Sequence, residues 1–194
     1  MKPILFNTEQ ARNILDGRKT NTRRPLRHQP APNWDVCERI GNTWCFYDSR
    51  DPDAHGYLKE NPYQVGDILY VRETWAIEEC QSCLSGLNYS VVYCQCRYVY
   101  KADGEKSIKW HPTIHMPREA ARIFLKVTDV RVERLQDITP DDMDKEGLPF
   151  CMSIAPYDGF EEMWNAIYAK RGYSWNSNPW VWVYEFERMK GEQG

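Results

Sequence analysis

The chain has 194 residues, of which 42% are hydrophobic and 27% are charged, and its formal net charge is −3. These values are typical of a folded globular protein, and they exclude a disordered chain, a collagen-like repeat and a uniformly basic protein that coats nucleic acid by charge alone. The charge is unevenly distributed, because the first 27 residues contain seven basic and two acidic side chains, which leaves them at +5 and the remainder at −8.

The first predicted elements are a short strand over residues 4–6 and a helix. Asn7, with Gln10 three residues later, forms a capping-box pattern that begins the helix. Gly17 is placed to end it in a left-handed conformation. The segment 18–24 that follows is basic and rich in hydroxyl groups, which suits it to present polar groups from a rigid junction.

Residues 28–62 have a different composition, with four prolines and many Asp and Asn residues. Within them, the runs 34–40 and 43–47 flank Gly41-Asn42, which predicts an inserted hairpin with a two-residue turn. Two further strands are predicted beyond this segment, over residues 68–75 and 91–101.

The last third of the chain mixes strands and helices. Apolar residues alternate in two short runs over 123–132, which predicts a bent strand. Thr139-Pro140 begins a short helix, because a hydroxyl N-cap precedes proline at the first helical position. A longer helix begins at Asp158, and an aromatic strand follows over 180–186. Five or six strands with three short helices predict an α+β fold.

No segment has the composition of a membrane anchor. The N-terminal residues lack the apolar core of a secretory signal, and no stretch approaches the roughly 20 apolar residues that span a bilayer. We therefore expect a cytoplasmic protein with no membrane partner. Seven cysteines are an odd number for a disulfide framework, so reduced thiols or a metal site are favoured.

Four segments of the chain share a pattern with one known family: residues 14–24, residues 66–69 with Glu73 and Trp75 beyond them, residues 126–128 and residues 181–186. Together they resemble an ASCH domain. Residues 71–75 and 114–117 are similar to segments of the larger phage and prophage type of that family. The resemblance covers most of the chain in order. It implies a PUA-like mixed β-barrel with short flanking helices and the inserted hairpin, in a single domain with insertions at about 28–62 and 78–110, and a relationship to RNA-binding modules.

Small members of this superfamily are amidohydrolases that deacetylate N4-acetylcytidine with a Lys, a Thr three residues later and a Glu on a short helix. The resemblance carries these catalytic roles to Lys19, Thr22 and Glu146. A threonine hydroxyl needs a neighbouring base to take its proton, and a lysine serves as that base only when its pKa is lowered by burial or nearby cations. In a regular strand, residues 19 and 22 face opposite sides, so an irregular segment after Gly17 is required. The reaction requires no cofactor.

A basic cleft for a nucleoside or single-stranded RNA is predicted around these residues. Arginine binds phosphate through two parallel hydrogen bonds, and tryptophan stacks on bases. The predicted substrate-binding residues are Arg23, Arg24, Arg72, Glu73 and Trp75. The alternative is a structural one, in which residues 19–24 form a solvated basic strand that pairs with the acidic segment 137–146, and Glu73 pairs with one of the arginines.

Four clustered cysteines form a candidate structural zinc site: Cys80, Cys83, Cys94 and Cys96. Two such pairs separated by a loop resemble a tetrahedral site with four thiolates, although CxC is a less usual half than CxxC and buried cysteines without a metal are common.

Two other functions remain open from the sequence. One is a non-catalytic or RNA-cleaving module that uses the same basic cleft. The other is a phage accessory protein that acts through a protein partner, which an exposed apolar patch of Trp34, Trp44 and Tyr47 would favour.

Overall fold

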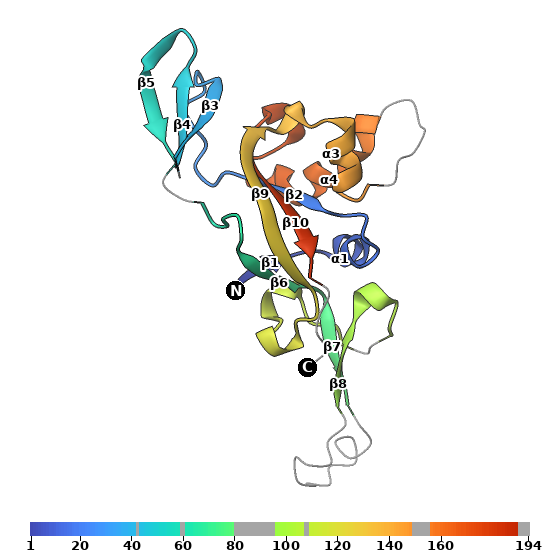
Figure 1. Ribbon diagram of the computed structural model, residues 1–194. Coiled ribbons are helices and arrows are strands. Elements are labelled where there is room, and N and C mark those ends of the chain that lie inside the picture. Colours follow the sequence, from blue (N-terminus) through green and yellow to red (C-terminus); the bar gives the residue numbers. More distant parts are fainter. Residues whose placement is uncertain (42, 59–60, 80–95, 107–108, 149–155, 190–194) are drawn as a thin grey trace. The chain divides into compact units, whose positions relative to one another are not determined.

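The computed structural model describes residues 1–41, 43–58, 61–79, 96–106, 109–148 and 156–189 (Figure 1). The chain divides into two compact units. The first unit comprises Met1–Gly17, Ile68–Leu125 and Arg188–Gly194, and the second comprises Arg18–Asp67 and Lys126–Glu187. The predicted insertions at about 28–62 and 78–110 therefore fall in different units. No helix within the described ranges is long and apolar enough to cross a membrane.

The first unit is built from short strands and one α-helix. These are β1 (Lys2–Leu5), α1 (Thr8–Leu15), β6 (Ile68–Arg72), β7 (Trp75–Glu78) and β8 (Arg97–Tyr100). Short 3₁₀ turns lie at Lys101–Asp103, Thr113–His115 and Arg118–Ala120. β1 pairs in parallel with β6, and β7 pairs antiparallel with β8. The strand predicted over 68–75 is thus two strands, since β6 ends at Arg72 and β7 begins at Trp75.

Local signals in α1 are confirmed. The Asn7 side chain accepts from the Gln10 backbone N–H at 2.8 Å, and the Gln10 side chain accepts from the Asn7 N–H at 3.2 Å, as a capping box requires. Gly17 has a φ of 75°, the left-handed conformation expected beyond the end of a helix.

The second unit holds the longer strands and two helices. They are β2 (Asn21–Pro25), β3 (Val36–Ile40), β4 (Thr43–Asp48), β5 (Asp51–Tyr57), β9 (Phe124–Arg134), α3 (Pro140–Lys145), α4 (Pro156–Tyr168) and β10 (Trp180–Arg188), where β9 begins and β10 ends in the first unit. Further 3₁₀ turns lie at Leu135–Asp137, Ala169–Arg171 and Trp175–Ser177. The strand order is β9-β10-β2, and β10 runs antiparallel to β2.

The predicted hairpin is confirmed. β3 and β4 pair antiparallel with Ile40 opposite Thr43, and Gly41 has a φ of 60°. β5 adds a third strand to this sheet. This three-stranded sheet contacts β10 through aromatic side chains, because the ring centroids of Trp44 in β4 and Trp182 in β10 are 6.3 Å apart.

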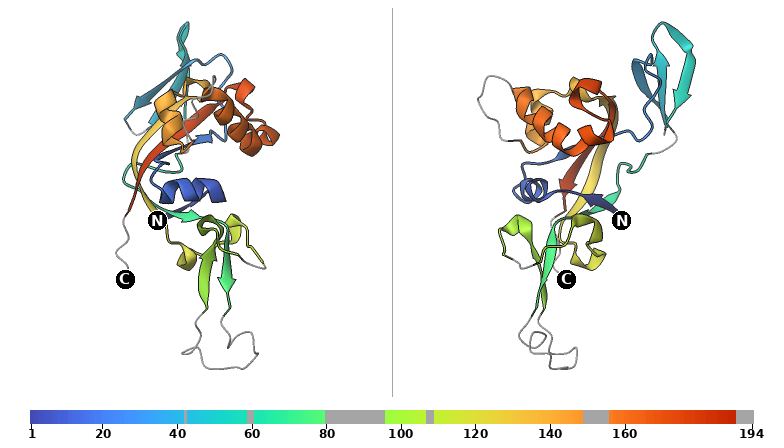
Figure 2. Two further views of the ribbon diagram at one scale, coloured as in Figure 1. Left: turned by 90° about the vertical axis from the view of Figure 1, so that its right-hand side faces the viewer. Right: turned by 180° about the vertical axis from the view of Figure 1, so that it is seen from behind.

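The two faces of β10 pack differently, because successive side chains of a strand point to opposite sides. Val181 and Val183 join a buried cluster with Phe160 and Trp164 of α4, which covers this face (Figure 2). The opposite face carries aromatic side chains, including Tyr184.

The fold is α+β as predicted, but the strands form open sheets, and no set of strands in the described residues closes into a barrel. β2 lies at the end of its strand order, so barrel closure would need another strand on its free side. That side meets α3 instead. The Thr20 N–H donates to the Lys145 carbonyl at 2.8 Å, and the Arg23 N–H donates to the Glu146 carboxylate at 2.8 Å.

Candidate functional site

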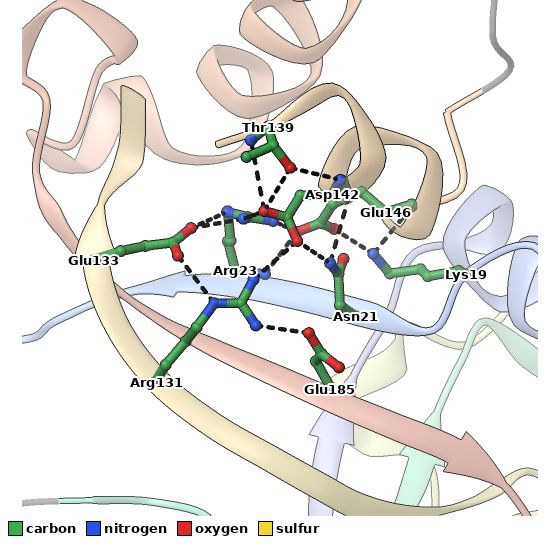
Figure 3. Close-up of polar contacts among 9 residues, drawn as sticks. All are labelled: Lys19, Asn21, Arg23, Arg131, Glu133, Thr139, Asp142, Glu146 and Glu185. Carbon is green, nitrogen blue, oxygen red and sulfur yellow. Dashed lines mark hydrogen bonds and ion pairs between the residues drawn. The ribbon is translucent and has the colours of Figure 1, made fainter. Parts of the chain in front are cut away.

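Lys19 and Glu146 form a buried ion pair in the second unit (Figure 3). Both residues are almost inaccessible to solvent, with 2% and 3% exposure. The Lys19 Nζ contacts the Glu146 carboxylate and also donates to the Glu146 backbone carbonyl at 3.1 Å. Glu146 is the C-cap of α3, and a cation at the C-terminal end of a helix also interacts favourably with the helix dipole.

The position of Glu146 at the end of α3 is set by sequence signals that begin and end this helix. Thr139 and Asp142 form a capping box, and Pro140 occupies the first helical position. Gly147 follows Glu146 with a φ of 84°, which ends the helix after six residues. The predicted short helix is therefore confirmed, and its last turn faces the residues before and within β2.

The alternation of side chains along the chain sends Lys19, Asn21 and Arg23 toward α3. Asn21 donates from Nδ2 to the Asp142 carboxylate at 3.3 Å. The Arg23 guanidinium contacts three carboxylates: Glu133 at 2.6 Å, Asp142 at 3.0 Å and Glu146 at 3.5 Å.

Arg131 of β9 extends this group into a network. Its guanidinium contacts Glu133 at 3.0 Å, Asp142 at 2.8 Å and Glu185 at 2.7 Å. The network thus joins β2, β9, β10 and α3 (Figure 3). Sequence reasoning missed three of its members, Arg131, Glu133 and Glu185, whereas Asn21 and Asp142 lie within the segments 19–24 and 137–146 that the structural alternative pairs. Two sequence patterns could have found some of these residues. Polar residues recur at every second position over 19, 21 and 23, and again at 131 and 133, and side chains two positions apart in a strand lie on the same face.

Burial lowers the pKa of the Lys19 ammonium, because a charged group loses its hydration inside the protein. The pair with Glu146 acts in the opposite direction, and the nearby Arg24 and Arg23 lower the pKa further. The net pKa of Lys19 lies below its ordinary value. This is the direction that a catalytic base requires.

Thr22 is buried in β2 with 2% exposure, and its cross-strand partner in β10 is Tyr184. Because the side chains of a strand alternate, the Thr22 hydroxyl lies on the opposite face of β2 from Asn21 and Arg23. The structure therefore brings Lys19 and Glu146 together and places Thr22 beside Tyr184.

The two adjacent arginines have different surroundings. The Arg23 side chain is only 1% exposed and is held by carboxylates, so it positions those carboxylates and is not accessible to a phosphate in solution. Arg24 donates to the Tyr168 hydroxyl at 3.0 Å and is partly exposed. Part of the basic strand thus pairs with the acidic segment, as the structural alternative predicts.

Arg72, Glu73 and Trp75 belong to the first unit, where they have partners of their own. Arg122 holds the fully buried Glu73 carboxylate through two hydrogen bonds of 3.0 and 3.2 Å. Arg72 donates to the Met116 carbonyl at 2.8 Å, and Trp75 stacks on His111 with 4.8 Å between ring centroids. Glu73 therefore pairs with an arginine, but with one that lies outside the N-terminal basic segment.

The zinc prediction concerns residues of which three, Cys80, Cys83 and Cys94, lie outside the described part of the chain. Cys96 is described and is partly buried. Among the described residues, no group of three His, Cys, Asp or Glu side chains is arranged to hold a metal ion. The zinc site stays a prediction.

Comparisons with known proteins do not assign the chain to a family. No family model matches it, and neither does any curated protein. Among solved structures, the crystal structure of protein EF3133 from Enterococcus faecalis V583, described as DUF984, is similar over 100% of this chain and 86% of that chain, with 10% identity and a TM-score of 0.44. A match at this level carries no argument about fold or function, and the ASCH resemblance stays a prediction.

Proposed function

We propose that this chain is an ASCH-type protein, related to PUA-like modules, that binds a nucleoside or single-stranded RNA and hydrolyses the amide of N4-acylated cytidine. The observation that supports the proposal most is the buried pair of Lys19 and Glu146. These residues come from distant parts of the sequence, and they match two of the three catalytic positions that the resemblance implies. Burial lowers the pKa of Lys19, which is the direction that a general base requires.

In the proposed reaction, neutral Lys19 takes the proton of the Thr22 hydroxyl through an intervening water molecule, because the two side chains lie on opposite faces of β2. The Thr22 oxygen attacks the acyl carbonyl, the bond to N4 breaks, and the proton held by Lys19 passes to the departing nitrogen. Water then hydrolyses the acyl-threonine ester and regenerates the enzyme. Glu146 orients the amine of Lys19 throughout. These steps use only protein groups and water, so they require no cofactor.

Incubation of the purified protein with N4-acetylcytidine, followed by chromatography of cytidine, tests this function. We expect the wild-type chain to release cytidine and Lys19→Met to lose roughly 10²–10⁴-fold in rate, the range of general acid–base catalysis. Lys145→Met is the matched control, because this lysine is 40% exposed and pairs with Asp141 on the surface of α3. Equal rates for wild type and Lys19→Met would contradict the proposal.

The alternative functions receive less support. Binding of RNA phosphates by Arg23 would require its guanidinium to leave three carboxylates. A phage accessory protein that acts through a protein partner would need Trp34, Trp44 and Tyr47 to form an exposed apolar patch. These three side chains are half-buried, and Trp44 packs against Trp182, which does not favour that function.

A further inference from the structure

Two segments of the second unit contain no acidic residue. Residues 18–34 include β2, and residues 163–184 extend from α4 into β10. The two segments are in contact, because the Tyr173 hydroxyl donates to the Arg27 carbonyl at 3.2 Å. In a chain with a net charge of −3, positive charge is therefore concentrated where these segments meet.

Three exposed cationic residues lie at this junction. Arg27 follows β2, and Lys170 and Arg171 follow α4. Among the residues that the structure describes, none of these three side chains is paired with a carboxylate. Arg50, another exposed cation of this unit, pairs with Asp48 at 2.9 Å. We refer to Arg27, Lys170 and Arg171 as the basic patch.

Tyr168 orients two arginines at the junction. The Arg171 guanidinium lies over the Tyr168 ring, 5.7 Å from its centroid, and Arg24 donates to the hydroxyl of the same ring at 3.0 Å. Gly172, with a φ of 88°, turns the chain after Arg171, and the Tyr173 N–H then donates to the Tyr168 carbonyl at 3.3 Å. A guanidinium that is already held against a ring loses less conformational freedom when it binds a ligand.

The chemistry of the basic patch fits the phosphates of a nucleic acid. Arginine binds a phosphate through two parallel hydrogen bonds, and neighbouring cations follow a phosphodiester backbone. The Tyr173 ring is half-buried beside Arg27. Aromatic rings among cations contact unstacked bases, which a single strand presents and an acidic peptide lacks.

We propose that the basic patch binds the phosphates of single-stranded RNA. The inference rests on the proposed function, which supplies RNA as the nucleic acid. It deepens that function, because it makes the substrate an acylated cytidine within a strand instead of the free nucleoside. It also assigns the phosphate contacts to exposed side chains, whereas the Arg23 guanidinium is held by carboxylates.

Fluorescence anisotropy with a labelled oligoribocytidine of about 12 nucleotides, a length in the range of single-strand sites, tests this surface. Each phosphate contact contributes about 0.7 to the negative slope of log affinity against log salt. Three contacts predict a slope of about −2, a loss of about 20-fold in affinity between 50 and 200 mM salt. The double variant Arg27→Gln with Arg171→Gln should reduce the steepness of the slope by about 1.4.

The matched control is Arg39→Gln with Arg50→Gln, which removes the same charge from exposed positions of the three-stranded sheet. We expect the control to bind the oligonucleotide with the slope of the wild type, and circular dichroism should show that both double variants are folded. Equal slopes in the patch variant and the wild type would overturn the inference, and so would an equal loss in both double variants. Competition by oligoglutamate as strong as by unlabelled RNA would overturn RNA as the partner.

The outcomes separate this inference from the function on which it rests. The oligonucleotide carries no acyl group, so its binding is measured without catalysis. If the protein binds RNA through the basic patch but releases no cytidine from N4-acetylcytidine, only the proposed hydrolysis is contradicted. If it releases cytidine but does not bind the oligonucleotide, only the inference is overturned.

Discussion

Lys19 and Glu146 are 127 positions apart in the sequence, yet their side chains form an ion pair that is almost completely buried. Two charges inside a protein are stable only when their geometry and remaining hydrogen bonds compensate for lost hydration. Here the compensation comes from the Glu146 carbonyl for Lys19 and from the Arg23 backbone N–H for the second carboxylate oxygen. These hydrogen bonds hold the Lys19 amine and the Glu146 carboxylate in one position relative to each other.

The first prediction concerns the coupling between these residues. In a double-mutant cycle of Lys19→Met and Glu146→Gln, each single change removes one member of the buried pair, and we expect each to cost about 3–5 kcal/mol. The double variant should be less destabilised than the sum of the two. Urea denaturation measures the free energies of unfolding. The exposed pair of Lys145 and Asp141 is the control and should couple by only about 0.3–0.5 kcal/mol. Equal coupling in the two pairs would contradict the prediction.

The second prediction concerns stability in acid. Burial alone raises the pKa of the Asp142 carboxyl, but Arg23 and Arg131 outweigh it and hold the pKa below its ordinary value. Such a group stabilises the fold above its unfolded pKa of about 3.9, and this contribution is lost as the pH falls through the lower folded pKa. The stability difference between wild type and Asp142→Asn should therefore shrink below about pH 4.

Urea denaturation from pH 7 down to pH 3 measures this difference. Asp141→Asn is the control, because the Asp141 side chain is 77% exposed and contacts only the surface Lys145 among the ion pairs described. A difference between wild type and Asp142→Asn that does not vary with pH would count against the prediction.

The third prediction uses two glycines. A Cβ added at Gly56 in β5 would lie 2.5 Å from the Trp34 ring, whereas one added at Gly159 in α4 would meet nothing within 4 Å. We expect Gly56→Ala to destabilise the protein by about 1–3 kcal/mol through overpacking. Gly159→Ala should stabilise it by about 0.5–1 kcal/mol, because alanine favours a helix. Thermal unfolding distinguishes the two, and a lower Tm for Gly159→Ala than for Gly56→Ala would refute the account.

Much of the local structure could be predicted from the sequence. The capping boxes at Asn7 and Thr139 and the turn at Gly41 depend on residues within a few positions of one another. The start of α4 at Pro156, before the predicted Asp158, also has a local reason, because proline is favoured in the first turn. Lys19 and Glu146 were found because the resemblance supplied both positions.

Features that depend on distant contacts could not be predicted. Arg131 and Glu133 face Arg23 only because β9, β10 and β2 are neighbours, and no spacing within one segment encodes that order. The absence of barrel closure among the described strands could not be predicted either. It depends on which element meets the free side of β2, and that element, α3, is distant in the sequence. Likewise, the partner of Glu73 is Arg122, which is 49 positions away.

The fourth prediction is the pH dependence of catalysis. If Lys19 acts as a base, kcat/KM rises as the pH increases through its folded pKa, with a midpoint below 10.5 because burial lowers that pKa. Glu146 raises the pKa of Lys19, so Glu146→Gln should move the midpoint to lower pH. Initial rates of cytidine release from pH 5 to 10 measure both profiles. A shift toward higher pH in Glu146→Gln would be incompatible with this assignment.

The central claim of the proposed reaction is that the Thr22 hydroxyl attacks the acyl carbonyl. This claim needs its own test, because Thr22 lies on the other face of β2 from the side chains that surround Glu146. Thr22→Val keeps the shape of the side chain and removes only the hydroxyl. Cytidine release from N4-acetylcytidine should be readily measured for the wild-type chain and lost in Thr22→Val, with the fold of both checked by circular dichroism. Release at the same rate by both proteins, or by neither, would contradict the account.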